Sequence, residues 1–548
     1  DIWKGVKFAS TFSYDFVMNK SRAWKDPRTS DGDDDNGRFS KDYNDITNMT
    51  WSNILTYQTK IKKKHNLDLL AGYEINSKES DGLGTTISNF ARWDKPEVNN
   101  GVVYQSMGGS NSTTRIVSYI TRANYDYDNK YYLGASWRTD GSSRLARENR
   151  WGNFWSLSGA WRVSSESFMK PLQNWLSDLK LRVSYGVNGT LPSSYYGYMG
   201  LSSLTSNYND NPGITQSQLE NKELTWETNY NFNSGIDLGF FDNRLNVTFE
   251  YYVRTTKNLL YSRPLSLATG FSSYLANIGK LQNKGYELEI RSTNIETKDF
   301  RWSTSLNLGH NANKILKLDG DLKQVTSGTS IHKVGLPYST YYMIEFAGID
   351  PVDGEPMFYK NTTDENGNLN KETTKDPRSA EKVILQCADP TITGGLGNSI
   401  SYKWFDLNFN VNFSFGAWNY DGAAGKLEHG GDGTLNIPIY YRKRWQKEGD
   451  ETSIERFVVG RSISMTDYAT TRRLYSGDYV RLKNLTFGFT LPKTWTRKVG
   501  IDNIRLYASG NNLLTWAAYD YIDPESGSSP SWDTPPMRTY TFGLEVKF

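Results

Sequence analysis

Apolar and polar side chains alternate along long stretches of this chain, most clearly in its last ten residues. Apolar side chains stand there at Tyr540, Phe542, Leu544, Val546 and Phe548, with small or polar residues between them. Because a strand points successive side chains to opposite faces, this segment predicts a strand with one apolar and one polar face. Taken alone, it is typical both of the closing strand of an outer-membrane barrel and of the edge strand of a soluble sandwich.

The same two-residue period recurs through the interior of the chain. Residues 405–416 carry an apolar side chain at every odd position, and residues 179–188, 245–254 and 485–491 repeat the pattern. Such runs span about 10–14 residues, longer than the usual soluble strand of about 5–6 and suited to a tilted membrane strand. They predict about sixteen strands, near residues 3–17, 46–60, 65–78, 114–127, 130–140, 154–164, 178–190, 226–241, 244–258, 283–294, 300–312, 391–403, 405–418, 478–491, 503–514 and 537–548.

The connections between these strands alternate between short and long. Short ones include 62–64, 128–129, 242–243, 296–298 and 403–404, while 18–45, 79–113, 191–225, 313–390 and 419–477 are long. Short turns at one rim and long loops at the other are the layout of outer-membrane barrels, whose long loops lie outside the cell. We therefore predict an all-β fold, a transmembrane antiparallel β-barrel, with residues 540–548 as its C-terminal barrel-assembly strand.

Composition agrees with a location in the bacterial outer membrane. The mean hydropathy is −0.65, and no apolar run is long enough for a membrane-spanning helix. Aromatic residues make up 14% of the chain, with 36 Tyr and 17 Trp, and these rings suit a membrane–water interface. The net charge of +3 gives no argument for nucleic-acid binding. Cys387 is the only cysteine, which excludes an intramolecular disulfide and a thiolate metal cluster.

Five groups of residues carry a family resemblance. They are Thr139-Asp140-Gly141-Ser142-Ser143-Arg144 with 149–152, 159–162, 166–169, 178–182 and 185–189; Leu224-Thr225-Trp226-Glu227-Thr228 with 239–245 and 257–260; Asn277-Ile278-Gly279-Lys280 with 283–287; residues 478–485; and 510–513 with Tyr521-Ile522-Asp523-Pro524-Glu525. In this order, across most of the chain, they resemble the SusC-like (SusC/RagA) family of TonB-dependent transporters from Bacteroidetes.

The resemblance implies a barrel of about 22 strands with a plug domain inside it. It also implies a SusD-like lipoprotein lid over the mouth, and TonB-dependent import of a large nutrient, a glycan or an oligopeptide. In such transporters the lid captures the substrate, the plug holds it, and TonB, driven by the proton gradient, pulls on the plug. We also expect pairs of transporter and lid to dimerise.

The N-terminus departs from this family pattern. Residues 1–8 resemble a mid-barrel strand, and the TonB box, the plug and about six early strands have no counterpart here. We therefore expect residues 1–548 to be the C-terminal part of the barrel. Sixteen strands alone would leave two open edges in lipid, where unpaired backbone groups are costly. The remaining part is expected upstream or as a separate polypeptide.

One acidic loop has the spacing of a calcium site. Asp31, Asp33 and Asp35 occupy alternate positions, and Asp42 is the twelfth residue from Asp31. Oxygen ligands at positions 1, 3, 5 and 12 form calcium loops, in which the sixth residue, here Asn36, adopts a left-handed turn. The alternative is a solvated acidic loop, because no helices flank it. Calcium is the only cofactor that the sequence suggests.

Aromatic residues in the long loops are the candidate ligand contacts. They are Trp418, Tyr420, Tyr440, Tyr441, Trp445, Tyr519 and Trp532. Flat rings stack on sugar faces or peptide side chains, as aromatic anchors do at other interfaces. Packing within the loops, contact with the lid and a place in the membrane belt are competing roles for the same rings.

Two other functions remain open at this stage. A passive porin would close its barrel within these residues and hold an open aqueous channel. An outer-membrane barrel enzyme would need a Ser–His pair beside a carboxylate. The histidines His65, His310, His332 and His429 are scattered and lack metal-site spacing, so the sequence predicts no catalytic residues and no enzyme.

Overall fold

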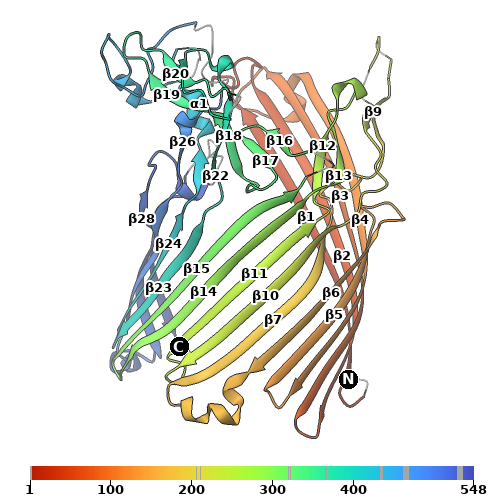
Figure 1. Ribbon diagram of the computed structural model, residues 1–548, viewed down its shortest axis with the longest axis vertical. Helices are drawn as coiled ribbons and strands as arrows, with labels where there is room; N and C mark the ends of the chain where they lie inside the picture. The colour runs from red at the N-terminus through yellow and green to blue at the C-terminus, as the bar shows by residue number, and fades with distance from the viewer. Residues whose placement is uncertain are drawn as a thin grey trace. The chain divides into compact units, whose positions relative to one another are not determined.

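The computed structural model is built almost entirely of β-strands. It describes residues 3–204, 207–209, 211–318, 320, 322–364, 367–431, 436–460, 468–526 and 535–548. Sixteen strands form one sheet whose order follows the chain (Figure 1). They are β1 (Val6–Lys25), β2 (Arg38–Ile61), β3 (His65–Phe90), β4 (Gly101–Tyr127), β5 (Tyr131–Ser142), β6 (Trp151–Arg162), β7 (Leu176–Thr190), β10 (Glu227–Phe240), β11 (Leu245–Lys257), β14 (Lys280–Glu296), β15 (Phe300–Lys317), β23 (Ile392–Tyr402), β24 (Phe405–Phe415), β27 (Tyr479–Thr490), β28 (Asn503–Ala517) and β29 (Thr539–Lys547). Each matches one predicted strand, so the expectation of sixteen strands is confirmed.

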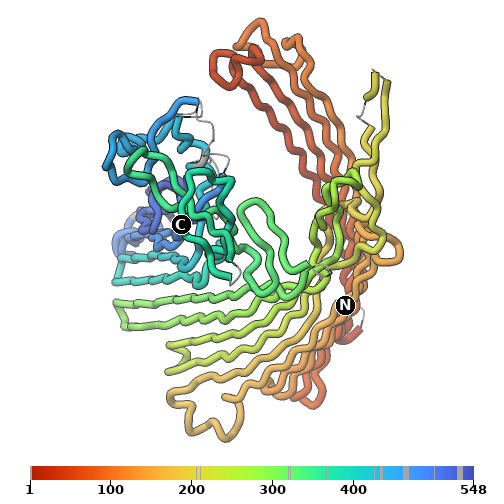
Figure 2. Tube along the Cα trace, turned by 45° about the horizontal axis from the view of Figure 1, so that its top comes forward, coloured from red at the N-terminus to blue at the C-terminus, as the bar shows by residue number. Residues whose placement is uncertain are grey.

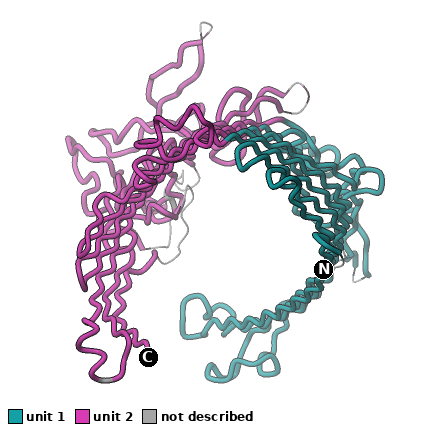
Figure 3. The backbone as a smooth tube through the Cα atoms, turned by 90° about the horizontal axis from the view of Figure 1, so that it is seen from below, with its two compact units in different colours: residues 1–161, 182–232, 255–279 teal, residues 162–181, 233–254, 280–548 magenta. Residues whose placement is uncertain are grey.

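The chain divides into two compact units, coloured separately in Figure 3. Unit 1 comprises residues 1–161, 182–232 and 255–279, and unit 2 comprises 162–181, 233–254 and 280–548. The strand pairs described within each unit are antiparallel.

The first four strands are longer than their sequence pattern predicts. They have 20, 24, 26 and 27 residues and run side by side in unit 1 (Figure 2). The expected loops 18–45 and 79–113 therefore shrink to 26–37 and 91–100. The reason is that polar residues such as those at 77–86 keep full backbone pairing with β4 although the apolar alternation has ended. Where both faces of a strand are wet, the two-residue period disappears but the ladder of hydrogen bonds does not.

Short turns join the strands at the rim opposite the long loops. Lys62 and Lys63 have φ of 49° and 63°, and Asp128 and Asn129 have φ of 56° and 53°. Two successive left-handed residues form the turn whose twist matches that of the flanking strands. The predicted tight turns are thus present, although the connections 163–175 and 491–502 of unit 2 are longer and contain short helices.

The long connections carry small sheets and short helices that the sequence pattern did not predict. The strands are β8 (Leu201–Ser203), β9 (Thr215–Gln218), β12 (Leu260–Pro264), β13 (Ser273–Asn277), β16 (Gln324–Ser327), β17 (Ser330–Lys333), β18 (Thr340–Ile344), β19 (Phe346–Ile349), β20 (Pro356–Tyr359), β21 (Thr373–Thr374), β22 (Lys382–Cys387), β25 (Trp418–Tyr420) and β26 (Leu474–Ser476). The α-helices are α1 (Gly422–Leu427) and α2 (Lys493–Thr496), and the 3₁₀ helices are η1 (Val98–Asn100), η2 (Val163–Ser165), η3 (Ser167–Leu172), η4 (Leu267–Thr269), η5 (Pro377–Ser379), η6 (Ile439–Lys443), η8 (Thr471–Arg473), η9 (Arg497–Val499) and η10 (Pro524–Ser526). Among the described residues, no helix has the length and apolar character needed to cross a membrane.

One face of the sheet in unit 1 is apolar and exposed. On β5, Leu133 is 62% exposed, and it is flanked by the exposed side chains of Tyr131 and Trp137. On the other face, the hydroxyls of Ser136 and Ser156 lie 2.6 Å apart in a hydrogen bond between β5 and β6. A continuous exposed apolar face of this kind marks a surface that contacts something other than water. Its two-residue alternation with a polar face is that of a membrane barrel.

Aromatic rings bound this apolar face at both ends. Near the short turns, Tyr131 stacks on Tyr127 and Trp161, with ring centroids 6.3 and 6.4 Å apart. Trp151, which pairs with Gly141, stacks on Tyr119 near the other end. The ten residue-to-residue steps from Tyr131 to Gly141 cover roughly 34 Å of strand, which at the usual tilt is about 25 Å, the height of the apolar band of outer-membrane barrels.

The C-terminal strand β29 also presents its apolar side chains outward. Phe542 is 83% exposed, and Tyr540 and Leu544 are exposed with it. Among the described residues, β29 ends the strand order and pairs with β28 alone. In the part of unit 2 that the structure describes, these side chains are therefore not buried in a protein core, as the sequence predicts for a lipid-facing strand. Their role in barrel assembly stays a prediction.

Candidate functional site: the loop ends and the polar face

In unit 1, three of the family-like segments meet at the base of the long loops. Leu224 and Trp226 of the second segment form a buried cluster with Leu145 and Phe154, which flank residues 149–152 of the first, and Trp226 Nε1 donates to Arg150 O at 2.9 Å. The Asn277 side chain accepts a hydrogen bond from Thr225 N at 2.7 Å and donates one to Thr225 O at 2.8 Å. These residues lie far apart in the chain and hold the loops 143–150, 191–226 and 258–279 together. In this structure, the residues of these family-like segments anchor the long loops to one another.

In unit 2, the last two family-like segments are joined by ion pairs. Arg481 on β27 is only 2% exposed, and its guanidinium lies 2.6 Å from Asp523 and 2.8 Å from Glu525. Lys483 adds a contact of 2.6 Å to Glu525. A buried arginine is stable only when its charge is paired and its donors are satisfied. The pairing fixes the loop that follows β28 to the neighbouring strand.

Most of the predicted ligand-contact aromatics gather in what we call the loop module, the described residues of 417–477 with 518–526. Trp418 and Tyr420 lie on β25, Tyr440 and Tyr441 on η6, Trp445 just after it, and Tyr519 after β28. Trp532 lies outside the described residues. Six of the seven rings thus belong to the loop module in unit 2, whose elements β26 and α1 are labelled in Figure 1.

Inside the loop module these rings are packed and hydrogen bonded. Tyr441 is 1% exposed and its hydroxyl donates to Glu455 at 2.9 Å. Trp445 donates from Nε1 to Pro351 O at 3.0 Å. Tyr519 donates to Asp421 at 3.0 Å. Their observed role is to hold the loops together, which is one of the competing roles that the sequence analysis names. Ligand contact by the partly exposed rings stays a prediction.

A buried ion-pair network lies at the centre of the loop module. Arg472 bridges Glu455 and Glu428, and Arg473 lies 3.3 Å from Glu428. Burial acts to lower the pKa of Arg472, but the two carboxylates raise it above its ordinary value. Burial raises the pKa of Tyr441, and the charge of Glu455 raises it further. The raised pKa values keep the Arg472 guanidinium charged and the Tyr441 phenol neutral at neutral pH, so their contacts form a fixed scaffold for the loops.

Tyr521 is an exposed aromatic of the loop module that the sequence analysis did not name as a ligand contact. It is 69% exposed, and its ring centroid lies 5.4 Å from that of Tyr440 and 5.3 Å from that of Tyr519. Its neighbours hold the ring at the surface while leaving it open to a partner. The signal in the sequence that could have indicated an exposed, fixed ring is its position two residues before Asp523, which pairs with Arg481.

The polar face of unit 2 carries a hollow of about 330 Å³ near the short turns. It is lined by Arg244, Asn246, Arg291, Ser292, Thr293, Ser303, Thr304, Ser305, Gly397, Asn398, Ser399, Asn408 and Asn410. Arg291 is paired with Glu289, and Arg244 donates to the carbonyls of Thr293 and Asn294. A surface of hydroxyls, amides and guanidinium groups suits contact with water or polar molecules.

The acidic loop between β1 and β2 does not bring the four predicted calcium ligands together. Asp31 accepts from Thr29 at 2.7 Å, and Asp35 lies 2.5 Å from Arg38. Because β2 begins at Arg38, Asp42 lies within a strand and accepts from Ser21 at 2.9 Å. Across the described residues, no group of three or more His, Cys, Asp or Glu side chains is placed to hold a metal ion.

Other features of this loop match the expectation. Asn36 has a left-handed φ of 46°, as a sixth loop position requires. Asp33 belongs to the turn that the loop forms before Asn36. Calcium binding by the loop stays a prediction, which radioactive calcium binding to a wild-type and an Asp33→Asn chain would test.

The histidines have structural contacts. His65 Nδ1 lies 2.7 Å from the Tyr125 hydroxyl, and His310 Nδ1 lies 2.7 Å from Thr391 O. The ring of His332 stacks on that of Tyr338, with centroids 4.2 Å apart. His429 Nδ1 accepts a hydrogen bond from Gly431 N at 3.2 Å. These contacts orient loops and strand ends.

Comparison with known proteins identifies the family. The family model described as "TonB dependent receptor-like, beta-barrel" matches residues 1–513. TonB-dependent receptor P3 of Formosa agariphila is 32% identical over 99% of this chain and 56% of its own length. TonB-dependent receptor SusC of Bacteroides thetaiotaomicron is 30% identical over 79% of this chain and 44% of its own length.

A solved structure agrees over the whole chain. The RagAB peptide transporter superposes with a TM-score of 0.88 and 28% identity, covering 100% of this chain and 60% of that chain. The chain thus spans about half the length of the curated relatives it matches. The chain is similar to SusC and RagA, and it is an outer-membrane protein. By sequence and by fold, it belongs to the β-barrel family of TonB-dependent receptors.

Proposed function

We propose that this chain supplies wall and external loops to a TonB-dependent importer of a large nutrient, an oligopeptide or a glycan. The observation that carries the proposal is the match of every part of the chain to a transporter described as a peptide transporter. The apolar outer face, the polar opposite face and the anchored loops are the parts that such an importer needs from its barrel. The relatives are receptors and transporters, and we infer that this chain has no enzymatic activity.

The proposed importer has components beyond these residues. The relatives are nearly twice as long as this chain, so the plug, the TonB contact and further strands are assigned to the remainder of the transporter. A SusD-like surface lipoprotein is the proposed lid, and pairs of transporter and lid are proposed to dimerise. The loop module is the proposed seat of the lid, because its buried ion pairs hold a defined surface at the long-loop end.

The test is energy-dependent uptake by the intact bacterium. Cells with and without the gene are supplied with fluorescent oligopeptides or oligosaccharides, with and without a protonophore. We expect one cargo class to enter wild-type cells only, and the protonophore to abolish its entry. Uptake that persists without a proton gradient would contradict active import and would favour the passive porin. Loss of neither cargo on deletion would contradict both transport functions.

The lid contact is tested separately by co-purification. Tyr521→Ala removes a 69% exposed ring of the loop module, and Tyr208→Ala removes an 85% exposed ring in the 191–226 loop of unit 1. If the loop module seats the lid, Tyr521→Ala lowers the amount of lipoprotein recovered with the transporter. Recovery that is unchanged in Tyr521→Ala, or lowered equally in both variants, would contradict this seat.

A further inference from the structure

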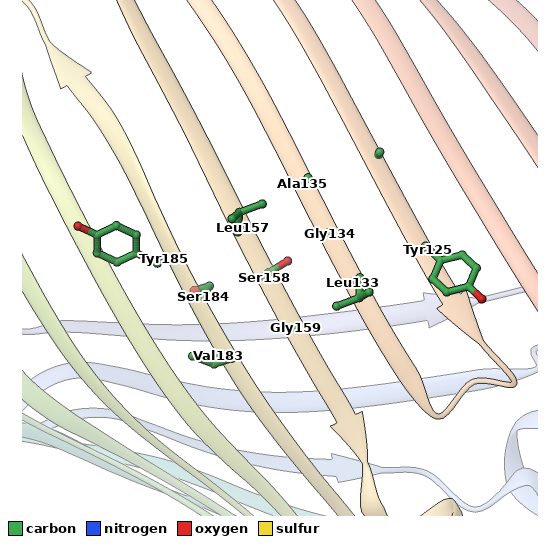
Figure 4. Close-up of a pocket in the computed structure, with 11 residues that line it drawn as sticks. Tyr125, Leu133, Gly134, Ala135, Leu157, Ser158, Gly159, Val183, Ser184 and Tyr185 are labelled. Atoms are coloured by element: carbon green, nitrogen blue, oxygen red, sulfur yellow. The ribbon is translucent and has the colours of Figure 1, made fainter.

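The exposed apolar face of unit 1 has a hollow over the neighbouring strands β4, β5, β6 and β7 (Figure 4). Its volume is about 570 Å³. It is lined by Ala123 and Tyr125 of β4, Leu133, Gly134 and Ala135 of β5, Leu157, Ser158 and Gly159 of β6, and Val183, Ser184 and Tyr185 of β7. Its surface is almost wholly apolar, and all these residues belong to unit 1.

The hollow exists because small residues stand among tall ones. Ala135 and Gly159 form its floor, whereas Leu133, Leu157 and Val183 rise around it (Figure 4). The polar residues of the lining contribute little, since their side chains point to the opposite face. A Cβ at Gly134, for example, would lie 2.6 Å from Ser158 Oγ on that face.

The space above Gly159 is open. A Cβ built there would meet Leu133 Cδ2, Tyr132 O and Val183 Cγ1, each at 3.9 Å, which is ordinary van der Waals contact. A side chain at this position would therefore enter the hollow without displacing the strand. This makes residue 159 the point at which the hollow can be filled.

The depth of the hollow in the membrane follows from its neighbours. Tyr125 and Leu133 lie three and four residues from the Asp128-Asn129 turn. The stacked rings of Tyr127, Tyr131 and Trp161 stand at the same end. Such rings lie at the level of the lipid headgroups, and short turns of outer-membrane barrels face the periplasm. The hollow is thus on the hydrocarbon side of the periplasmic aromatic girdle.

We propose that the hollow binds one acyl chain of a phospholipid of the periplasmic leaflet, whose headgroup lies at the aromatic girdle. The hollow is continuous with the membrane face, so hydrocarbon chains are what covers it. Water does not fill an apolar cavity, and an empty one loses the dispersion contacts of its walls. A chain lying in the hollow contacts protein on several sides, whereas a chain on a flat strand face contacts it on one.

The test uses the complete transporter in proteoliposomes that contain phosphatidylethanolamine with a photoactivatable diazirine in its acyl chain. After irradiation, labelled peptides are mapped by mass spectrometry. We expect residues 155–161 and 183–185 to be labelled above the rest of the apolar face. Labelling spread evenly over the exposed apolar strands would overturn the proposal.

Gly159→Leu fills the hollow, and Ala71→Leu adds the same side chain on the exposed face of β3 outside it. We expect labelling of the hollow to fall about tenfold in Gly159→Leu, which corresponds to about 1.4 kcal/mol of lost contact, and to stay unchanged in Ala71→Leu. Unchanged labelling in a folded Gly159→Leu would overturn the proposal. If that variant does not fold, Leu157→Ala, which removes a wall, is measured instead, with the same two outcomes.

Discussion

Arg472→Met tests whether the buried ion pairs hold the loop module. The substitution keeps most of the side-chain length but removes the charge beside Glu455, which is 0% exposed, and Glu428, whose side chain is 12% exposed. Removing one partner of a buried ion pair costs roughly 3–5 kcal/mol, because the other charge stays buried without compensation.

The contacts that remain place the expected cost at the lower end of that range. Tyr441 still donates to Glu455 at 2.9 Å, and Arg473 still lies 3.3 Å from Glu428. We therefore expect Arg472→Met to destabilise the closed loop module by about 3 kcal/mol, which is roughly a hundredfold change in its opening equilibrium.

Hydrogen exchange of individual amides measures this opening. Trp445 N donates to Ile454 O at 2.9 Å, and Asp421 N donates to Arg473 O at 2.9 Å. Both amides should exchange roughly a hundredfold faster in Arg472→Met, while amides of the β23–β24 ladder should not change. Arg472→Met with Glu455→Gln should recover much of the protection, because it removes the uncompensated charge.

The matched control is Arg378→Met. Arg378 pairs with Asp376 at 2.8 Å, but its side chain is 64% exposed, so water screens the pair and its loss should leave the loop module unchanged. Exchange at Trp445 and Asp421 that is equal in wild type and Arg472→Met would refute the reasoning.

Three further predictions concern other parts of the chain. Burial lowers the pKa of His332, so the unfolded β16–β17 hairpin binds a proton first as the pH falls. The stability of the folded hairpin is then full above the ordinary histidine pKa of about 6.5 and decreases below it. Amide exchange in the hairpin, corrected for intrinsic rates, should therefore become faster below that pH. His332→Gln should remove this pH dependence. Leu145→Ala opens a cavity in the cluster with Leu224 and should cost roughly 2–5 kcal/mol locally, seen as faster exchange of the Thr225 amide than of amides in β15; equal exchange would contradict it. Lys63→Gly relieves a left-handed φ of 63° by about 1 kcal/mol and should raise the urea midpoint of unfolding, whereas a lower midpoint would show that the turn is unstrained.

The sequence by itself determined the sixteen strands and, where the alternation is regular, which side chains share the apolar face. The period of two is a local property, readable at 405–416 or at 540–548 without knowledge of any partner strand. The tight turns were equally local, because Asp128 and Asn129 tolerate the left-handed backbone that such turns need.

Tertiary structure alone decided how far the strands extend and which loop residues are exposed. Residues 77–86 pair with β4 through backbone groups that carry no side-chain signal. Tyr441 is buried and Tyr521 exposed, although both are tyrosines in long loops. Their difference comes from Glu455 and Arg472, which the chain brings beside Tyr441 from 14 and more residues away. Whether a side chain is buried depends on such distant partners, so it cannot be read from the residue's own type or from its neighbours in the sequence.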